Sequence, residues 1–404
     1  MPADANVSEA MEGDDLAPLR SLVFNDQTVR ETLGRIEQPS DFVSTAQHLA
    51  RARGLNLATE AVASRLTPDP LALWRHNTPA QTAPQTPQPG WLPVEVGQDH
   101  RGYAVRWAWF GDHRLADAFY ESEVRRALSL PFNRLFNFQT GLGELIAWAE
   151  KLRPLEPSGF IFHMSRCGST LAAQMLAASP ANVVVSEAAP IDAAIAIARG
   201  NAGLDGPALL KAMVGAFGQK RDPRAERFFI KLDCWHTLAL PLFRAAFPNT
   251  PWVFMCRDPV EVMVSQMRQR GSQMVPQFVP PSLYGIDLPS GVPDEDYCAR
   301  VLASVCEGAL RGHANSAGLM VNYSEMPDAL FSRVLPHFGV TPDEAERAAM
   351  AGAARFDAKT VGLDFRPDAD EKRRAASDKV RRATNDHLDA PYAKLEALRA
   401  AQAA

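Results

Sequence analysis

The chain has 404 residues, of which 46% are hydrophobic and 22% charged, and its net charge is −5 at pH 7. This composition is typical of globular domains, and the acidic balance gives no reason to expect nucleic-acid binding. No run of about 18 apolar residues occurs, so no membrane span is expected, and the acidic, polar start is not a targeting segment. Five cysteines without a C-x-x-C spacing favour a reducing cytoplasm over a disulfide framework or a zinc site.

The first 90 residues predict an accessory unit and a linker. Helical periodicity over residues 19–75 indicates a small helical domain spanning 1–76, with a disordered start. The Pro-, Gln- and Thr-rich stretch at 77–90 is typical of a solvated linker. The segment SDFVSTAQHLARARGLNL resembles the Nif11-like leader domain, which implies a peptide or protein partner for this unit. A plain accessory bundle of two or three helices is the alternative.

An α/β pattern fills the rest of the chain. Residues 91–150 contain an alternating strand at 103–110 and an amphipathic helix at 114–129, and we expect them to pack on the domain at 151–404. In that domain short apolar strands alternate with helices, which is typical of a parallel sheet covered on both faces. Strands are expected at 159–163, 182–186, 227–232, 251–256 and 318–323, and helices at 169–179, 190–217, 236–247, 258–270, 326–338 and after a capping box at 341–344. The predicted fold is an α/β, P-loop-type three-layer sandwich with a central parallel sheet.

The stretch FIFHMSRCGSTLAAQML (160–176) runs from a strand through a loop into a helix. Loop amides and the positive end of the helix favour an anion there, beyond the carboxyl end of the strand. The frame nearly matches the ATP-binding pattern G-x-x-x-x-G-K-[ST], but His163 replaces the first glycine and Ser169 the lysine. Arg166 is the remaining cation, and its fork can hold two oxyanions without a metal. The loop residues expected at the ligand are Ser165, Arg166, Cys167, Gly168, Ser169 and Thr170, with Cys167 more a packing residue than a nucleophile.

A second segment, PWVFMCRDPVEVMVSQMRQR (251–270), places Arg257 at a strand end and Ser265 eight residues later on the next helix. These two side chains can converge on one doubly charged phosphate. The alternative is an ordinary helix start at Asp258 with a solvated arginine.

Together, SRCGSTL and CRDPVEVMVSQ resemble the 5′-phosphosulfate loop and the 3′-phosphate motif of PAPS-dependent sulfotransferases. The most similar branch includes tyrosylprotein sulfotransferases and bacterial sulfotransferase-family proteins, and the resemblance covers residues 155–385. It implies that the loop grips the sulfate-bearing 5′-phosphate of 3′-phosphoadenosine 5′-phosphosulfate (PAPS) and that Arg257 and Ser265 grip its 3′-phosphate. LMVNYSEM (319–326) resembles a third motif and implies that Tyr323 lies near the nucleotide. The implied reaction is metal-free sulfuryl transfer to a hydroxyl group of a small molecule, glycan or peptide.

An alcohol or phenol acceptor needs a general base within hydrogen-bond reach. Glu187 follows the strand after the loop helix and matches the glutamate of the tyrosylprotein branch. Lys231 and Asp233 correspond to the Lys-x-His of cytosolic sulfotransferases, where the histidine is the base, but aspartate replaces that histidine here. We predict Glu187 as the base, with Lys231 and Asp233 as supporting groups and His236 as a weaker candidate.

The sequence leaves two readings open for each of two further segments, and it leaves two alternative functions. The proline-rich segment 271–296 is either a lid over the acceptor or a surface excursion. The basic segment 370–382 is either a solvated helix face or, by the resemblance, a segment in which Lys372 or Arg374 reaches the 3′-phosphate. A P-loop kinase or NTPase without its lysine is the alternative enzyme, and a non-catalytic module on the same scaffold is the alternative to an enzyme.

Overall fold

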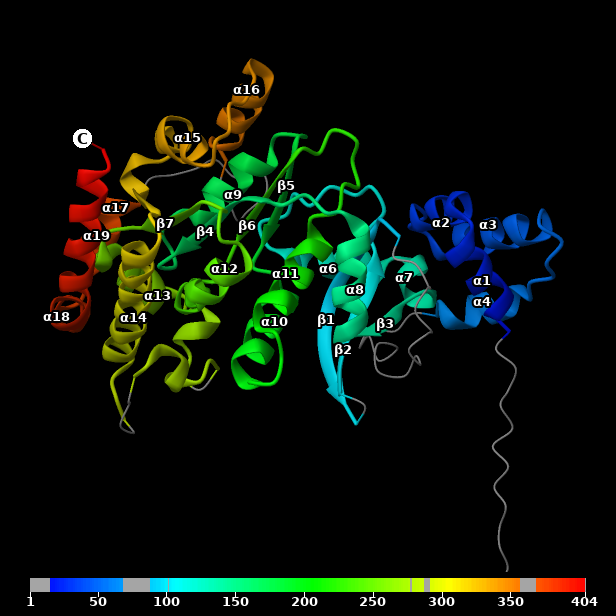
Figure 1. Ribbon diagram of the computed structural model, residues 1–404, viewed down its shortest axis with the longest axis horizontal. Coiled ribbons are helices and arrows are strands. Elements are labelled where there is room, and N and C mark those ends of the chain that lie inside the picture. Colours follow the sequence, from blue (N-terminus) through cyan, green and yellow to red (C-terminus); the bar gives the residue numbers. More distant parts are fainter. Residues whose placement is uncertain are drawn as a thin grey trace, which may run out of the picture.

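The computed structural model describes residues 15–67, 88–100, 102–276, 278–286, 291–356 and 368–403. The predicted disordered start and most of the predicted linker at 77–90 lie outside these residues. Figure 1 shows a small helical unit at one end, a short antiparallel sheet beside it, and a larger α/β part that carries the C-terminal helices. No helix in the described part of the chain is long and apolar enough to cross a membrane.

Four short helices form the N-terminal unit: α1 (Ala17–Asn25), α2 (Gln27–Gly34), α3 (Pro39–Arg51) and α4 (Thr59–Arg65). Helix α3 begins with a proline, Pro39, and its N-cap is Gln38. The rings of Phe24 and Phe42 face the next part of the chain, with centroids 5.7 Å from Trp91 and 6.3 Å from Phe136. The unit therefore shares one hydrophobic core with the body of the protein.

An antiparallel sheet with three helices follows: β1 (Trp91–Asp99), β2 (Gly102–Trp109), α6 (Tyr120–Ser129), α7 (Pro131–Leu135), β3 (Phe138–Gly141) and α8 (Leu142–Leu152). The helix predicted at 114–129 begins only at Tyr120. Its first residues are held in a loop because the carboxylate of Glu123 accepts the N–H groups of Ala116 and Asp117 over 2.7 and 2.8 Å. This cap replaces the helical hydrogen bonds that the periodicity predicted.

The larger sheet has five parallel strands: β4 (Pro157–His163), β5 (Asn182–Ser186), β6 (Arg227–Lys231), β7 (Trp252–Cys256) and β8 (Leu319–Asn322). Their spatial order is β5-β6-β4-β7-β8. The first strand, β4, therefore lies in the centre, with β5 and β6 on one side of it and β7 and β8 on the other. β7 is buried along its whole length, as expected for a strand covered on both faces. This arrangement confirms the predicted α/β fold with a central parallel sheet.

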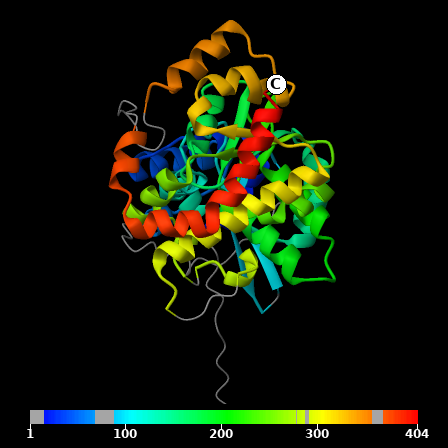
Figure 2. The same ribbon diagram turned by 90° about the vertical axis from the view of Figure 1, so that its left-hand side faces the viewer.

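Helices flank the parallel sheet: α9 (Ser169–Ala177), α10 (Ala189–Gly200), α11 (Gly206–Phe217), α12 (Leu240–Ala246), α13 (Pro259–Arg268), α14 (Asp294–Asn315), α15 (Leu335–His337), α16 (Glu344–Ala353), α17 (Ala369–Ala375), α18 (Asp378–Ala383) and α19 (Asp389–Ala401). Two 3₁₀ turns, η1 (Cys234–Ala239) and η2 (Ser272–Met274), border the functional site described below. In Figure 2 the C-terminal helices α18 and α19 (red) face the viewer and lie against α14 (yellow).

Two predicted helix starts differ from the structure. The helices expected over 190–217 are α10 and α11, but the helix expected at 236–247 begins as the 3₁₀ turn η1. The predicted capping box is shifted, because Asp343 and not Thr341 is the N-cap and Glu346 completes the box. Helix α14, with 22 residues, had no sequence prediction.

Candidate functional site

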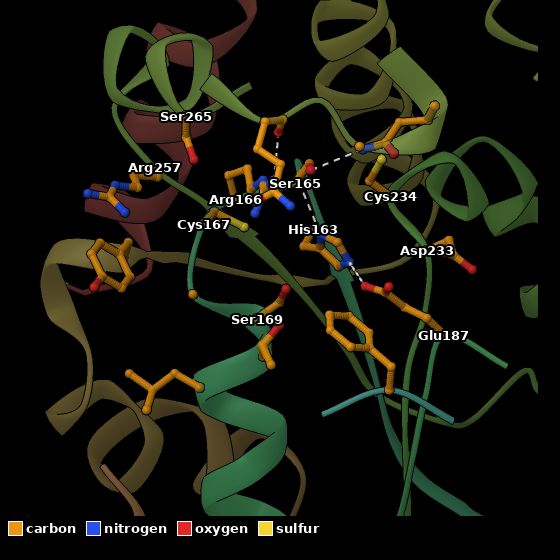
Figure 3. Close-up of a pocket in the computed structure, with 18 of the residues that line it drawn as sticks. His163, Ser165, Arg166, Cys167, Ser169, Glu187, Asp233, Cys234, Arg257 and Ser265 are labelled. Carbon is orange, nitrogen blue, oxygen red and sulfur yellow. Dashed lines mark hydrogen bonds and ion pairs between the residues drawn. The ribbon is translucent and has the colours of Figure 1, made fainter. Parts of the chain in front are cut away.

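A cavity of about 740 Å³ opens beyond the carboxyl ends of β4, β6 and β7. It is lined by every residue predicted for the site except Lys231 and two weaker candidates, His236 and Arg374. Figure 3 shows Arg257 and Ser265 on one side of it, Glu187 and Asp233 on the other, and the β4–α9 loop between them. Segments that are distant in sequence therefore line one cavity.

The β4–α9 loop has a left-handed backbone at three positions. The φ angle is 82° at Ser165, 51° at Arg166 and 82° at Gly168. At Gly168 a side chain is excluded twice, since a Cβ would also lie 2.4 Å from the ring of Tyr323. The loop ends at the N-terminus of α9, the positive end of that helix, and its N-cap Gly168 has no side chain to bond the first N–H groups.

His163, at the end of β4, holds this loop in place through hydrogen bonds. Its Nδ1 accepts the backbone N–H of Ser165 over 3.0 Å, and its Nε2 donates to the carbonyl of Leu232 over 2.8 Å. Nε2 also lies 3.4 Å from Oε1 of Glu187. Burial lowers the pKa of His163, so the ring is neutral with its proton on Nε2. A side chain thus fixes the loop at the position where an ATP-binding loop has glycine.

Arg166 and Cys167 have different roles within the loop. The guanidinium of Arg166 lines the cavity, and its Nη2 donates to the carbonyl of Gln269 over 2.6 Å. The Cys167 thiol is buried and donates to the carbonyl of Met255 over 3.1 Å. Burial raises the pKa of Cys167 to about 11, so the thiol is protonated at neutral pH. The expected packing role of Cys167 agrees with this geometry.

Arg257 is the centre of a charged cluster on the far side of the cavity. Its Nε donates to Glu261 over 2.7 Å and its Nη2 to Asp368 over 2.8 Å. Its guanidinium stacks on the ring of Tyr323, with 4.3 Å between the guanidinium carbon and the ring centroid. Lys372 Nζ lies 2.7 Å from the second oxygen of Asp368. Two cations therefore grip a single carboxylate beside Ser265, and α17 contributes to the cavity wall.

Glu187 lies at the opposite side, in a buried ionic group. Its carboxylate is bonded to the ammonium of Lys231, and its backbone has φ 52°. Burial opposes ionisation of Glu187, but the charge of Lys231 and the hydrogen bond from His163 outweigh it and hold the pKa well below its usual range. Lys231 is only 1% exposed and does not line the cavity, whereas Glu187 does. The ammonium of Lys231 lies 5.2 Å from the ring centroid of Phe119.

Asp233 follows β6 and faces the same part of the cavity. Burial, and next the negative charge of Glu187, raise the pKa of Asp233 to about 7. Its neighbour His236 accepts the backbone N–H of Asp233 over 3.3 Å and lies 2.8 Å from Asp192. His236 is 1% exposed and does not line the cavity, so its contacts are those of a capping residue.

Some residues of the cavity were not found from the sequence. Phe119 and Trp235 provide apolar surface, and Gln269, Gln273 and Asp368 provide polar groups. Asp368 belongs to the segment just before the basic stretch at 370–382, of which Lys372 reaches the cavity. Within the segment 271–296 the described residues Gly271, Ser272 and Gln273 line it.

Comparisons with known proteins give structural similarity at low identity. No family model matches the chain, and no curated protein matches it by sequence. The sulfotransferase domain from the curacin biosynthetic pathway is 14% identical, with a TM-score of 0.37, and the match covers 58% of this chain and 98% of that one. A sulfotransferase from Mycobacterium avium is 13% identical, with a TM-score of 0.33 and coverage of 52% and 71%. One from Mycobacterium tuberculosis H37Rv is 16% identical, with a TM-score of 0.29 and coverage of 55% and 77%.

Proposed function

We propose that this protein is a sulfotransferase that moves a sulfuryl group from PAPS to a hydroxyl group of an acceptor. One observation carries the proposal: the loop with Arg166 and the cluster at Arg257 and Ser265 both line the same cavity. A nucleotide with phosphate groups at both its 3′ and 5′ positions needs two such anion sites at once. An ATP-binding loop needs only one.

Arg166 and the loop amides would hold the 5′ end of PAPS, and Arg257 with Ser265 would hold the 3′-phosphate. A guanidinium can donate two parallel hydrogen bonds to one phosphate group, which makes Arg257 suited to this task. Tyr323, stacked under Arg257 and packed on Gly168, would keep that guanidinium and the loop in register. Ser169 and Thr170 add hydroxyl groups at the start of α9.

Sulfuryl transfer resembles phosphoryl transfer, an in-line displacement in which charge spreads over peripheral oxygens. The acceptor oxygen forms a bond to sulfur while the bond from sulfur to the bridging oxygen breaks and leaves 3′-phosphoadenosine 5′-phosphate (PAP). Catalysis then comes from positioning and from groups that neutralise the leaving phosphate. Arg166 lies in the loop that holds this phosphate and would supply the positive charge.

The acceptor proton must pass to a base, and two carboxylates line the acceptor side of the cavity. Glu187, the base predicted from the sequence, forms an ion pair with Lys231 and has a low pKa, which makes it a weak proton acceptor. Asp233 has a pKa of about 7, close to the value that serves a general base at neutral pH. We therefore favour Asp233 as the base, with Glu187 fixing Lys231 and His163 and raising the pKa of Asp233.

The acceptor would lie between the two aromatic side chains of Phe119 and Trp235, near Asp233. A hydroxyl-bearing small molecule, glycan or peptide fits this description. We also propose that the protein is most similar in its motifs to the tyrosylprotein sulfotransferase branch. A peptide or protein partner would bind the N-terminal helices.

Calorimetric titration with PAP tests the proposal directly. We expect binding in the micromolar range, with a much weaker response to ATP–Mg²⁺. Arg257→Ala should weaken PAP binding far more than binding of 5′-AMP, which lacks the 3′-phosphate. No heat of binding at millimolar PAP, or equal binding of ATP–Mg²⁺, would overturn the proposal. A panel of phenols, sugars and peptides assayed for PAP release from PAPS then identifies the acceptor.

A further inference from the structure

Two buried amides hold the hydroxyl of Ser165. Nε2 of Gln266, on α13, donates to Ser165 Oγ over 2.9 Å, and Nε2 of Gln273, on η2, donates over 3.1 Å. Gln266 is fully buried and Gln273 is 6% exposed. Both donors come from segments more than a hundred residues along the chain, at separations of 101 and 108 residues. The fold, and not a local turn, therefore brings the three side chains together.

Gly271 contacts both glutamines, the first through a hydrogen bond and the second through close packing. Its backbone N–H donates to Oε1 of Gln266 over 3.0 Å, so the NH₂ group of that amide must face Ser165. The side chain of Gln273 packs over Gly271, where a Cβ would lie 2.5 Å from Oε1 of Gln273. Any side chain at this position would therefore have to displace the Gln273 amide from its present place.

The two glutamine amides leave the Ser165 hydroxyl able to form one more hydrogen bond, in which it is the donor. A hydroxyl oxygen accepts two hydrogen bonds and donates one, and both acceptor sites are filled here. No acceptor for the hydroxyl proton lies within hydrogen-bond distance among the described residues. Ser165 lines the cavity, and its backbone N–H is already bonded to His163. The side chain thus offers one hydrogen and no lone pair to a ligand.

We propose that Gln266, Gly271 and Gln273 are positioning residues that make Ser165 an obligatory hydrogen-bond donor to an anionic oxygen at the 5′ end of the bound nucleotide. The inference rests on the proposed function, since it names how one loop residue meets PAPS or PAP. A donor that is oriented before the ligand arrives needs no reorganisation when charge develops on the leaving phosphate. It also selects oxygens that only accept, which is the case for phosphate and sulfate oxygens at neutral pH.

Replacing the amide of Gln266 or Gln273 by a carboxylate reverses the direction of its hydrogen bond with Ser165. In Gln273→Glu the ionised carboxylate accepts the Ser165 proton and removes it from the ligand. We expect the Kd for PAP to rise about tenfold or more at pH 8, because a hydrogen bond to a charged group is lost. At pH 5.5 a buried glutamic acid is protonated and can donate again, so the ratio of variant to wild-type Kd should fall towards one. Gln266→Glu should behave in the same way.

Gln269→Glu is the matched control. It adds the same charge at the cavity wall, and the bonds of the described structure do not link its side chain to Ser165. We expect a smaller loss of PAP affinity that stays constant between pH 8 and pH 5.5, because an exposed glutamate remains ionised there. Gly271→Ala is the uncharged variant, and it should weaken PAP binding at both pH values by displacing Gln273. Thermal unfolding shows which variants fold. If the glutamate variants do not fold, the inference is tested with Gly271→Ala alone.

A double-mutant cycle completes the test. In a Ser165→Ala background, Gln273→Glu should cost no more affinity than Gln269→Glu, because the proton that it captures is gone. The inference is overturned if Gln273→Glu matches Gln269→Glu in size and pH dependence, if its full penalty persists without Ser165, or if a folded Gly271→Ala variant binds PAP like the wild type. Failure of the wild-type protein to bind PAP at all would overturn the proposed function together with this inference, and so is distinguishable from these results.

Discussion

The carboxylate of Asp368 lies 2.8 Å from Nη2 of Arg257 and 2.7 Å from Nζ of Lys372, so it takes the position of an anion between two cations of the cavity wall. Burial opposes its ionisation, yet the hydrogen bonds from Lys372 and Arg257 lower the pKa of Asp368. A nucleotide 3′-phosphate that binds Arg257 must compete with this carboxylate.

Asp368→Asn should therefore tighten PAP binding. The neutral amide competes less well for Arg257 and Lys372, and we expect the Kd to fall about tenfold, which corresponds to about 1.4 kcal/mol. Asp370→Asn, two residues along in α17, removes the same charge from an exposed position and should change the Kd little. 5′-AMP should gain nothing from either substitution. Equal or weaker PAP binding by Asp368→Asn, measured by calorimetry, contradicts the competition.

The pH dependence of turnover separates Asp233 from Glu187 as the base. The base acts when deprotonated, so with Asp233 the rate should rise about tenfold per pH unit below 7 and level off above it. With Glu187, whose pKa is held low, the rate should be flat from pH 6 to 9. Asp233→Asn should abolish turnover while leaving the affinity for PAP within about twofold. The measurement is PAP release from PAPS with the acceptor identified by the panel.

Glu187→Gln sharpens this distinction. The charge of Glu187 raises the pKa of Asp233, so its removal should move the midpoint of the pH–rate profile to lower pH. The ammonium of Lys231, freed from its partner, acts in the same direction. A complete loss of turnover with intact PAP binding would instead assign the base to Glu187, as the sequence predicts.

Gly168→Ala should abolish nucleotide binding. The substitution requires a left-handed alanine and brings a methyl group within 2.4 Å of the Tyr323 ring, which supports Arg257. Gly143→Ala, in α8, is the control, because a Cβ there meets nothing within 4 Å and its φ is ordinary. It should leave PAP affinity unchanged and unfolding stability equal or up to about 1 kcal/mol higher. Wild-type PAP affinity in Gly168→Ala would show that this contact is dispensable.

The loop cysteine should be inert in the folded protein. All five cysteines are free and buried, and the pKa of Cys167 is raised to about 11. Iodoacetamide at pH 8 should therefore leave the native chain unmodified, while the urea-unfolded chain should take up five alkyl groups, as mass spectrometry can count. Rapid modification of Cys167 in the native protein would contradict the packing role.

The sequence predicted the parallel sheet because its strands are local patterns, and the two segments that we propose as anion sites are local patterns too. Short apolar strands and the spacing between Arg257 and Ser265 can be read within a few residues of each other. The strand expected at 103–110 is β2, and all five strands of the parallel sheet lie where they were expected, within two residues at each end.

What the sequence did not predict depends on contacts between distant segments. Gln266 and Gln273 look like ordinary polar residues until the fold places them on Ser165, and Asp368 is one acid among many before a basic stretch. The choice between Glu187 and Asp233 as the base also depends on a contact between distant segments. The ion pair between Lys231 and Glu187, which sets the two carboxylates apart in pKa, joins two neighbouring strands that are 44 residues apart in sequence.

The two left-handed residues of the loop, Ser165 and Arg166, have a consequence for evolution in the laboratory. A residue other than glycine in this conformation costs about 1–3 kcal/mol, so glycine in place of Arg166 should make the chain more resistant to heat. The same change deletes the guanidinium at the cavity. Glycine in place of Ser165 would instead leave the buried amides of Gln266 and Gln273 without their acceptor. A library selected only for thermal tolerance should therefore accumulate glycine at 166 and lose nucleotide binding, while one selected for turnover should keep the arginine.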